Sequence, residues 1–392
     1  MISIMSYMIQ RMAQDLVGQM AQQFPAVLIL GPRQCGKTTL AKEFLSGAYF
    51  DLEKPSDYAV FADDPELALS RLEGALILDE AQQLPSLFAV LRSVIDEDRK
   101  SNGRFYLLGS VNPGLVQQVS ESLAGRVGMV ELTPFLYPEI ADSLSGLDEY
   151  WLRGGYPEAC RESNANMRVR WIEQYVQSLV QRDLAGHGLK TSPQEMRRFM
   201  GMLAHVHGGL LNASELGRSM GLTYHTITSY LDILEGHFLI RQLQPWHSNL
   251  GKRLVKKPKL YIRDSGLLHY LLGIKTQREL LQSPRRGASW EGLLIEQVIA
   301  LERLARAGSQ FWFYRTRAGA EVDLILDRGE ERLGYEFKCA SSVSRGDATG
   351  LKAALADGVI SRGYVVHAGS REYPLSDKIN ALPAPKLISS WK

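Results

Sequence analysis

The chain contains, directly after the apolar run 26–29, the stretch Leu30-Gly31-Pro32-Arg33-Gln34-Cys35-Gly36-Lys37-Thr38-Thr39. This stretch matches the phosphate-binding pattern G-x-x-x-x-G-K-[ST] without a substitution. Gly31 and Gly36 let backbone N–H groups turn inward around phosphates, and Lys37 can reach the β and γ oxygens. The hydroxyl of Thr38 is placed for Mg²⁺. With a strand before it and a helical stretch after it, the motif predicts that residues 31–39 bind ATP.

Two adjacent carboxylates follow the next apolar run, which reads Ala75-Leu76-Ile77-Leu78-Asp79-Glu80. A short continuous apolar run is typical of a parallel strand that is buried on both faces. Adjacent acids at a strand end also occur in solvated turns. Downstream of a complete phosphate loop, however, we expect Asp79 to hold Mg²⁺ and Glu80 to polarise the water that attacks the γ-phosphate.

A third apolar strand, 104–109, ends at Ser110-Val111-Asn112, which places the side chain of Asn112 where it can sense the γ-phosphate. A helix-like stretch, 115–123, then leads to Gly125-Arg126. An arginine at this place can stabilise the charge that develops on the transferred phosphate, in the same subunit or in a neighbouring one. Taken alone, Arg126 would be an ordinary surface residue.

Residues from about 20 to 145 resemble the AAA+ class of P-loop ATPases, in a prokaryotic group with the pattern Ser122-Leu123-Ala124-Gly125-Arg126. Further pieces of that group occur as Trp151-Leu152-Arg153-Gly154-Gly155-Tyr156-Pro157, Arg182-Asp183 and Lys259-Leu260-Tyr261-Ile262-Arg263-Asp264-Ser265-Gly266. The resemblance implies Mg²⁺-dependent ATP hydrolysis. It also implies a homo-oligomer in which Arg126 completes the site of the next subunit.

Size and composition predict an ordinary protein of two or three domains, because 392 residues are too many for one core. We place the boundaries so that the domains are 1–140, 141–284 and 285–392. The formal net charge of +2 excludes no class of partner. The three cysteines, Cys35, Cys160 and Cys339, have neither disulfide nor zinc-site spacing. Since no basic leader and no membrane-length apolar run is visible, we expect a cytoplasmic protein without a membrane partner.

The middle of the chain reads as a helical lid followed by a winged helix. The turn Gly154–Pro157 either closes over the nucleotide base or simply connects two helices. Residues 211–222 predict a capped helix with a glycine turn, and a second helix runs from Thr223 to about Gly236. In that helix we expect one face to be buried and one to be free for contacts: Tyr224, Ile227, Leu231 and Leu234 inward, and His225, Thr228, Ser229 and Asp232 outward.

Two wing strands are expected at 238–243 and 259–262, joined through a basic stretch, 251–259, whose five cations can meet phosphates. Those cations are Lys252, Arg253, Lys256, Lys257 and Lys259. Winged helices also serve as protein contacts, and Asp232 would repel a phosphate. The sequence therefore leaves DNA contact and protein docking both open.

The last domain carries a second set of chemical side chains. A helix at 289–304 with Glu291 precedes strands at 311–314 and 321–326, the latter with Asp323. The next strand places Glu336 and Lys338 on one face, because side chains alternate along a strand. With a helix at 348–356 and a strand at 363–366, this order resembles the core of PD-(D/E)xK nucleases. The resemblance implies Mg²⁺ on the carboxylates Glu291, Asp323 and Glu336 and a catalytic role for Lys338.

The sequence thus predicts an α/β protein: an AAA+ P-loop domain with a parallel sheet, a helical lid and winged helix, and a PD-(D/E)xK nuclease-like domain. Two functions compete. The first is an ATPase that acts on nucleic acid, DNA being favoured, with a C-terminal domain that either cuts or only grips the strand. The alternative is a nucleotide-dependent switch that binds protein partners and carries an inactive nuclease-like scaffold. An E-x-K pair such as Glu336–Lys338 can also be a mere surface salt bridge.

Overall fold

The computed structural model of the chain describes residues 9–110, 119, 121–184, 191–246 and 255–391. Contacts divide the chain into two compact units, one of residues 1–135 with 236–238 and one of residues 136–235 with 239–392. Asn112, Lys252 and Arg253 lie outside the described residues, as does most of the helix expected at 115–123. Each unit is described by itself.

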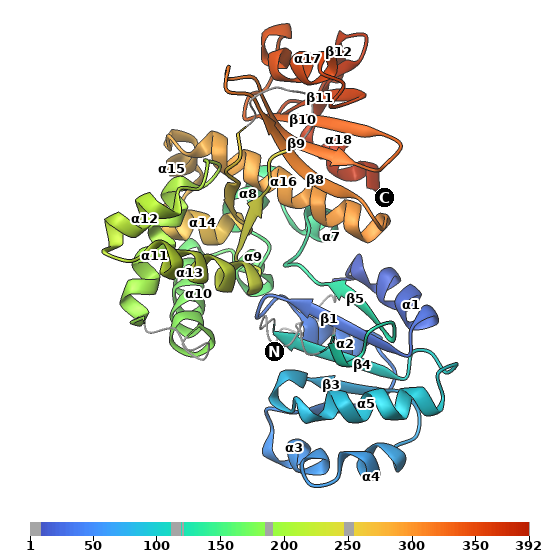
Figure 1. Cartoon of the computed structure of the whole chain (residues 1–392). Coiled ribbons are helices and arrows are strands. Elements are labelled where there is room, and N and C mark those ends of the chain that lie inside the picture. The colour runs from blue at the N-terminus through green and yellow to red at the C-terminus, as the bar shows by residue number, and fades with distance from the viewer. Residues whose placement is uncertain (1–8, 111–118, 120, 185–190, 247–254, 392) are drawn as a thin grey trace, which may run out of the picture. The chain divides into compact units, whose positions relative to one another are not determined.

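The first unit is built on a five-stranded sheet in the order β2-β3-β4-β1-β5, with every pair parallel (Figure 1). The strands are β1 (Ala26–Gly31), β2 (Ala48–Asp51), β3 (Leu76–Asp79), β4 (Phe105–Ser110) and β5 (Val127–Glu131). The helical elements are α1 (Ala13–Gln23), α2 (Lys37–Phe44), α3 (Pro55–Ala62), α4 (Pro65–Ser70), the 3₁₀ turn η1 (Ala81–Gln83) and α5 (Ser86–Glu97).

The parallel sheet predicted from continuous apolar runs is confirmed. Every residue of β1 and of β3 is buried, as expected for central strands covered on both faces. The apolar face of α5 packs into the same core, through Leu87, Phe88 and Leu91. Because all strands run parallel, the loops after β1 and β3 leave the same edge of the sheet, where a ligand site is expected in such folds.

The second unit begins with helices. They are α7 (Tyr137–Ile140), η2 (Ala141–Ser143), α8 (Leu147–Arg153), α9 (Pro157–Arg161), α10 (Ala165–Ser178), the π-helical turn η3 (Leu179–Asp183), α11 (Pro193–Val206), α12 (Ala213–Met220) and α13 (Tyr224–Gly236). A two-stranded antiparallel sheet of β6 (Ile240–Leu243) and β7 (Lys259–Ile262) follows, and then α14 (Ser265–Leu271) and α15 (Gln277–Gln282).

The expected helix, glycine turn, second helix and two strands are therefore all present. Gly221 ends α12 in the left-handed conformation (φ 71°), which glycine adopts without strain. Ile227, Leu231 and Leu234 are buried as predicted. The prediction for Tyr224 was wrong, because its side chain is 54% exposed. Tyr224 is the first residue of α13 and precedes the turns that pack on the core.

The remaining elements form a six-stranded mixed sheet in the order β12-β13-β11-β10-β9-β8, with helices around it (Figure 1). They are α16 (Arg286–Ala305), β8 (Gln310–Arg315), β9 (Glu321–Asp327), β10 (Arg332–Lys338), η5 (Arg345–Ala348), α17 (Thr349–Ala356), β11 (Arg362–His367), β12 (Tyr373–Ser376), β13 (Ile379–Pro383), α18 (Ala384–Ile388) and η6 (Ser389–Trp391). The expected order of one helix, three strands, one helix and one strand is found, and the hairpin β12–β13 extends it.

The two-stranded sheet is attached to the edge strand β8 by backbone hydrogen bonds. The amide of Phe313 donates to the carbonyl of Gln244 over 3.0 Å, and the amide of Trp246 donates to the carbonyl of Phe313 over 2.7 Å. The amide of Val255 donates to the carbonyl of Arg315 over 3.2 Å. These bonds help to explain why the boundary predicted between residues 284 and 285 falls inside one compact unit.

Candidate functional site

The loop that follows β1 has the backbone of a phosphate-binding loop. Gly36 has φ 101° and Gln34 has φ 61°, both in the left-handed region that favours glycine. Gly31 is required for a different reason, because a Cβ there would lie 2.1 Å from the carbonyl oxygen of Leu132. The loop then opens directly into α2, so its N–H groups lie at the N-terminus of a helix.

Two cations hold this loop from inside the first unit. The ammonium of Lys37 is buried and donates to the carbonyls of Gly31 and Pro32, each over 3.0 Å. The guanidinium of Arg11 donates to the carbonyls of Cys35 (2.9 Å) and Thr133 (2.6 Å). Arg11 was not predicted, because it lies before α1 and outside any motif. Its contacts fix the loop against the segment after β5.

A hydroxyl and a carboxylate meet beside the loop, as the motif requires. The hydroxyl of Thr38 donates to Oδ2 of Asp79 over 2.6 Å, and the carboxyl group of Asp79 is buried. The phenol of Tyr49 donates to the same oxygen over 2.7 Å. Burial, and then the hydrogen bond to Asp79, raise the pKa of Tyr49 well above its ordinary value. An adjacent hydroxyl and carboxylate are ligands that suit Mg²⁺, so the residues fit this ion. Tyr49 was not predicted.

Glu80 follows β3 with a backbone conformation that is rare for its residue type, φ 52° and ψ 45°. Non-glycine residues in this left-handed region are strained, and such residues gather at functional sites. The amide nitrogen of Gln82 donates to Oε2 of Glu80 over 2.5 Å, and the backbone N–H of Glu80 donates to Oδ1 of Asp79 over 3.0 Å. The turn thus fixes Glu80 directly beside the Asp79 carboxylate.

Arg126 pairs with a carboxylate of its own unit. Its Nε and Nη2 atoms donate to the two oxygens of Asp96 over 2.8 and 2.7 Å, and its Nη1 atom donates to the carbonyl of Ala124 over 2.8 Å. A role for Arg126 in the site of another subunit would require this pair to open.

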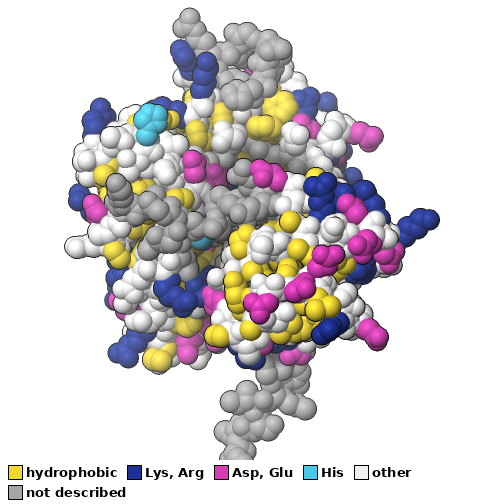
Figure 2. Space-filling view, turned by 60° about the horizontal axis from the view of Figure 1, so that its bottom comes forward, with side chains coloured by type: hydrophobic (Ala, Val, Ile, Leu, Met, Phe, Trp, Pro, Cys, Tyr) yellow, Lys and Arg dark blue, Asp and Glu magenta, His cyan; other side chains and the backbone are white. Residues whose placement is uncertain are grey.

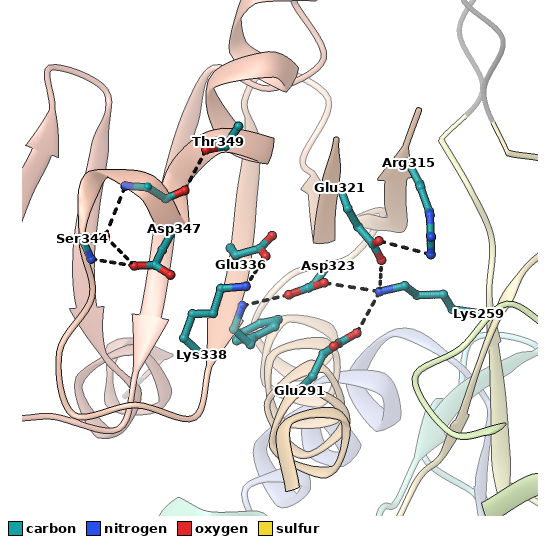
Figure 3. Close-up of polar contacts among 12 residues, drawn as sticks. Lys259, Glu291, Arg315, Glu321, Asp323, Glu336, Lys338, Ser344, Asp347 and Thr349 are labelled. Carbon is teal, nitrogen blue, oxygen red and sulfur yellow. Dashed lines mark hydrogen bonds and ion pairs between the residues drawn. The ribbon is translucent and has the colours of Figure 1, made fainter. Parts of the chain in front are cut away.

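A second polar cluster lies in the second unit, where Lys259 reaches from β7 toward three carboxylates (Figure 3). Its ammonium is 2.9 Å from Oε1 of Glu291 on α16. It is also 2.5 Å from Oε1 of Glu321 and 3.3 Å from Oδ1 of Asp323, both on β9. Tyr261, on the same strand as Lys259, donates its phenol to Glu291 Oε1 over 2.5 Å.

This position corrects the prediction that Lys259 meets phosphates. Its side chain is only 2% exposed, whereas Lys256 and Lys257 of the same basic stretch are exposed. Burial alone would lower the pKa of Lys259, but the charges around it, that of Glu291 foremost, raise the pKa well above its ordinary value. Lys259 is therefore a charged ammonium inside the unit.

Glu336 and Lys338 form a separate pair beside this cluster, with Lys338 Nζ 2.6 Å from Glu336 Oε1. Asp323 links the cluster to this strand, because its Oδ2 atom accepts the backbone N–H of Phe337 over 3.0 Å. Burial, and then the charge of Asp323, raise the pKa of Glu336 to about 8 and that of Glu291 to about 7.

The structure therefore joins Glu291 and Asp323 through one ammonium and leaves Glu336 with Lys338. Among the described residues, no three His, Cys, Asp or Glu side chains are grouped so that they could hold a metal ion. Glu321 was not predicted, and Lys259 was predicted to contact phosphates and not these carboxylates. Strand alternation could have indicated Glu321, since it lies two residues before Asp323.

The turn Gly154–Pro157 has a structural task in the second unit. Gly154 has φ 76°, and the N–H of Gly155 donates to Oδ2 of the buried Asp264 over 2.7 Å. The other carboxylate oxygen of Asp264 accepts the N–H of Leu267 at the start of α14. The turn thus connects α8 and α9, which is one of the two roles that the sequence allowed.

Side chains expected to be free for contacts on α13 are accessible. His225, Ser229 and Asp232 are exposed and Thr228 is half-buried. On the face seen in Figure 2, basic and acidic side chains are mixed, with hydrophobic side chains between them. This mixture accords with the net charge of +2 and does not by itself indicate that this face binds a polyanion.

Three parts of the chain match known protein families. Residues 23–141 match the family described as AAA domain. Residues 144–278 and 286–387 match two families described as domains of unknown function, DUF8612 and DUF4143. Within the parts that the structure describes, no helix is long and apolar enough to cross a membrane.

Two relatives align over nearly the whole chain. Uncharacterized protein Rv2008c of Mycobacterium tuberculosis and Uncharacterized protein Mb2031c of Mycobacterium bovis are each 41% identical over 371 residues, which is 93% of this chain and 81% of theirs. Among solved structures, the Aeropyrum pernix ORC1 protein in complex with DNA matches 63% of this chain and 86% of its own, at 14% identity and a TM-score of 0.29. A score of that size is too low for any inference on function.

Proposed function

The chain belongs to the family of these two mycobacterial proteins, and we propose that its AAA domain binds and hydrolyses ATP. The observation that carries the proposal is the 2.6 Å contact between the hydroxyl of Thr38 and the buried carboxylate of Asp79, beside the loop 31–39. These two groups come from the two motifs that phosphoryl-transfer sites of this class combine. Glu80 adjoins them in its fixed turn.

Each side chain then has a defined task. The loop N–H groups and Lys37 hold the phosphates, which requires the Lys37 ammonium to exchange its carbonyl partners for phosphate oxygens. Thr38 and Asp79 hold Mg²⁺, which neutralises phosphate charge when bound. Glu80 orients the attacking water, and Arg126 of a neighbouring subunit stabilises the developing charge once it leaves Asp96. Asn112 is proposed as the sensor.

We further propose that the second unit acts on nucleic acid through a winged helix made of α11–α13, β6 and β7. Exposed Lys256 and Lys257 supply cations for phosphates, and exposed Tyr224 supplies a ring on which a base can stack. Asp232 on α13 favours the alternative, a nucleotide-dependent switch that binds a protein partner. ATP turnover that responds to nucleic acid separates the two.

Metal-dependent cleavage is a second candidate function for the C-terminal domain. The order α16-β8-β9-β10-α17-β11 is that of a nuclease-like core, and Glu291 and Asp323 share one cation, Lys259. In this candidate, Glu291, Asp323 and Glu336 would hold Mg²⁺ and Lys338 would stabilise charge on the phosphate. The Glu336–Lys338 pair would have to open for both to take part.

The test is ATP hydrolysis and Mg²⁺- or Mn²⁺-dependent cleavage, measured side by side on single-stranded, double-stranded and branched DNA and on RNA. We expect hydrolysis that at least one nucleic acid stimulates. Hydrolysis that none of them alters would favour the protein-binding switch. Cleavage that disappears in Asp323→Ala while ATP hydrolysis persists would establish the second candidate.

A further inference from the structure

The carboxylate of Asp79 is held by three hydrogen-bond donors. The phenol of Tyr49 donates to its Oδ2 atom over 2.7 Å, and the hydroxyl of Thr38 donates to the same oxygen over 2.6 Å. The backbone N–H of Glu80 donates to Oδ1 over 3.0 Å. Among the described residues these are its only donors, and Asp79 is 3% exposed. Tyr49 therefore supplies one of the few contacts that can orient this buried group.

The strand register explains how Tyr49 reaches this carboxylate. Asp51 on β2 is the register partner of Asp79 on β3, and Tyr49 lies two residues before Asp51, on the same face of the strand. Two residues of a strand rise by about 6.6 Å, so a long side chain is needed to reach Asp79 from this position. The ring also contacts α2, where Nζ of Lys42 lies 4.5 Å from the ring centroid. Contacts with two elements thus fix the phenol.

These hydrogen bonds decide which oxygen atoms remain for a cation. Because the hydroxyl of Thr38 gives its proton to Oδ2 of Asp79, the lone pairs of the hydroxyl oxygen stay available to Mg²⁺. If the carboxylate turned away, Thr38 would lose this acceptor and its proton could face the cation instead. A second donor on Oδ2 opposes that turn.

The phenol of Tyr49 remains protonated while it does so. Burial, and then the hydrogen bond to Asp79, raise the pKa of Tyr49 well above its ordinary value. The phenol is therefore a donor throughout the neutral range of pH. Hydrogen bonds to an ionised acceptor are also stronger than those between neutral groups.

We propose that Tyr49 is a positioning residue of the ATP site, whose phenol holds the Asp79 carboxylate in the orientation in which Thr38 and Asp79 together bind Mg²⁺. The inference rests on the proposed function and adds to it a residue that belongs to neither motif. Because Tyr49 acts through Asp79, it affects the part of ATP binding that depends on Mg²⁺. The contacts of Lys37 and the loop with phosphate do not depend on it.

The test measures ATP affinity by isothermal titration calorimetry, in EDTA and at rising Mg²⁺ concentrations. The full chain carries Glu80→Gln throughout, so that ATP is not turned over, and is compared with and without Tyr49→Phe, which removes only the phenol oxygen. The matched control is Tyr106→Phe on β4, a half-buried tyrosine of the same sheet without a hydrogen bond to Asp79.

We expect Tyr49→Phe to reduce the tightening of ATP binding by Mg²⁺ about 10-fold or more, the usual effect of removing a residue that orients a metal ligand. Affinity in EDTA should stay unchanged, and Tyr106→Phe should alter neither value. An unchanged Mg²⁺ effect in Tyr49→Phe overturns the inference. An equal loss of affinity with and without Mg²⁺ also overturns it, because that loss would reflect a general structural role.

A second comparison uses chains that carry Asp79→Asn, and it also serves if Tyr49→Phe alone folds poorly, since no charged carboxylate then loses its donor. Here Tyr49→Phe should lower the Mg²⁺ effect no further. A further loss overturns the inference, because only independent residues add their effects in free energy. Failure of the proposed function looks different: a chain with Tyr49 and Asp79 intact would then not bind ATP, with or without Mg²⁺.

Discussion

Glu296 should be one of the main stabilising residues of the second unit. Its carboxylate lies on α16, is 8% exposed and pairs with two guanidinium groups, those of Arg241 on β6 and Arg263 just after β7. Nη2 of Arg241 and Nε of Arg263 each lie 2.8 Å from Oε2. Replacing Glu296 by Gln keeps the size of the side chain and removes the negative charge that both arginines face.

The expected loss follows from the pKa of Glu296. Burial alone would raise this pKa, but the two arginines lower it from 4.5 to about 2. Since one pKa unit corresponds to about 1.4 kcal/mol, the carboxylate contributes about 3 kcal/mol to the free energy of unfolding at pH 7. Breaking a buried ion pair by removing one partner costs roughly 3–5 kcal/mol, which agrees.

The pH dependence has a definite sign. Because the folded-state pKa lies below the unfolded one, the contribution is complete above about pH 4.5 and is lost as the pH falls toward 2. The stability gap between wild type and Glu296→Gln should therefore be constant from pH 7 to about pH 5 and should narrow at lower pH.

Urea denaturation followed by tryptophan fluorescence provides the assay, because all six tryptophans lie in the second unit. Glu330→Gln, a charge removal at an exposed turn, serves as the matched control and should shift the free energy of unfolding by no more than about 0.5 kcal/mol. If Glu296→Gln behaves like that control at pH 7, or if the gap stays unchanged between pH 5 and pH 3, the reasoning is refuted.

Three further predictions concern the proposed activities. Lys37→Ala should lose ATP binding, measured by isothermal titration calorimetry, since the β and γ oxygens lose their cation; unchanged affinity would remove Lys37 from the site. Arg126→Ala should lower the hydrolysis rate while Asp96→Ala should not, and mixing Arg126→Ala with Lys37→Ala subunits should restore some turnover; no restoration would contradict a shared site. Removing both Lys256 and Lys257 should weaken DNA binding and reduce the slope of log K against log salt by roughly 1.8; an unchanged slope would assign them to a solvated loop.

Much of the first unit could be predicted because its signals are local. The apolar runs at 26–29 and 75–78 became β1 and β3, since strands buried on both faces need no alternation. The loop between β1 and α2 followed from two glycines and a lysine at fixed spacing. The place of Asp79 and Glu80 could be predicted because they directly follow the apolar run that forms β3.

The contacts that were not predicted join residues far apart in the sequence. Arg11 is 122 residues from Thr133, and Lys259 is 64 residues from Asp323, so neither pairing leaves a periodic signal. Lys259 looked like part of a basic loop because its neighbours Lys256 and Lys257 are indeed exposed. The prediction for Tyr224 was wrong for a different reason: helical periodicity assigns it to the buried face, but it is the first residue of α13 and its side chain is 54% exposed.

Thr38, Asp79 and Glu80 are proposed to form a site that hydrolyses ATP. The most direct measurement compares wild type and Glu80→Gln for Mg²⁺-ATP binding and for phosphate release in the same preparations. We predict equal binding and a rate at least about 100-fold lower in Glu80→Gln, because only the activation of water is lost. Equal rates in the two proteins would show that Glu80 does not activate the water, and wild type that does not bind Mg²⁺-ATP would show that this is not an ATP site.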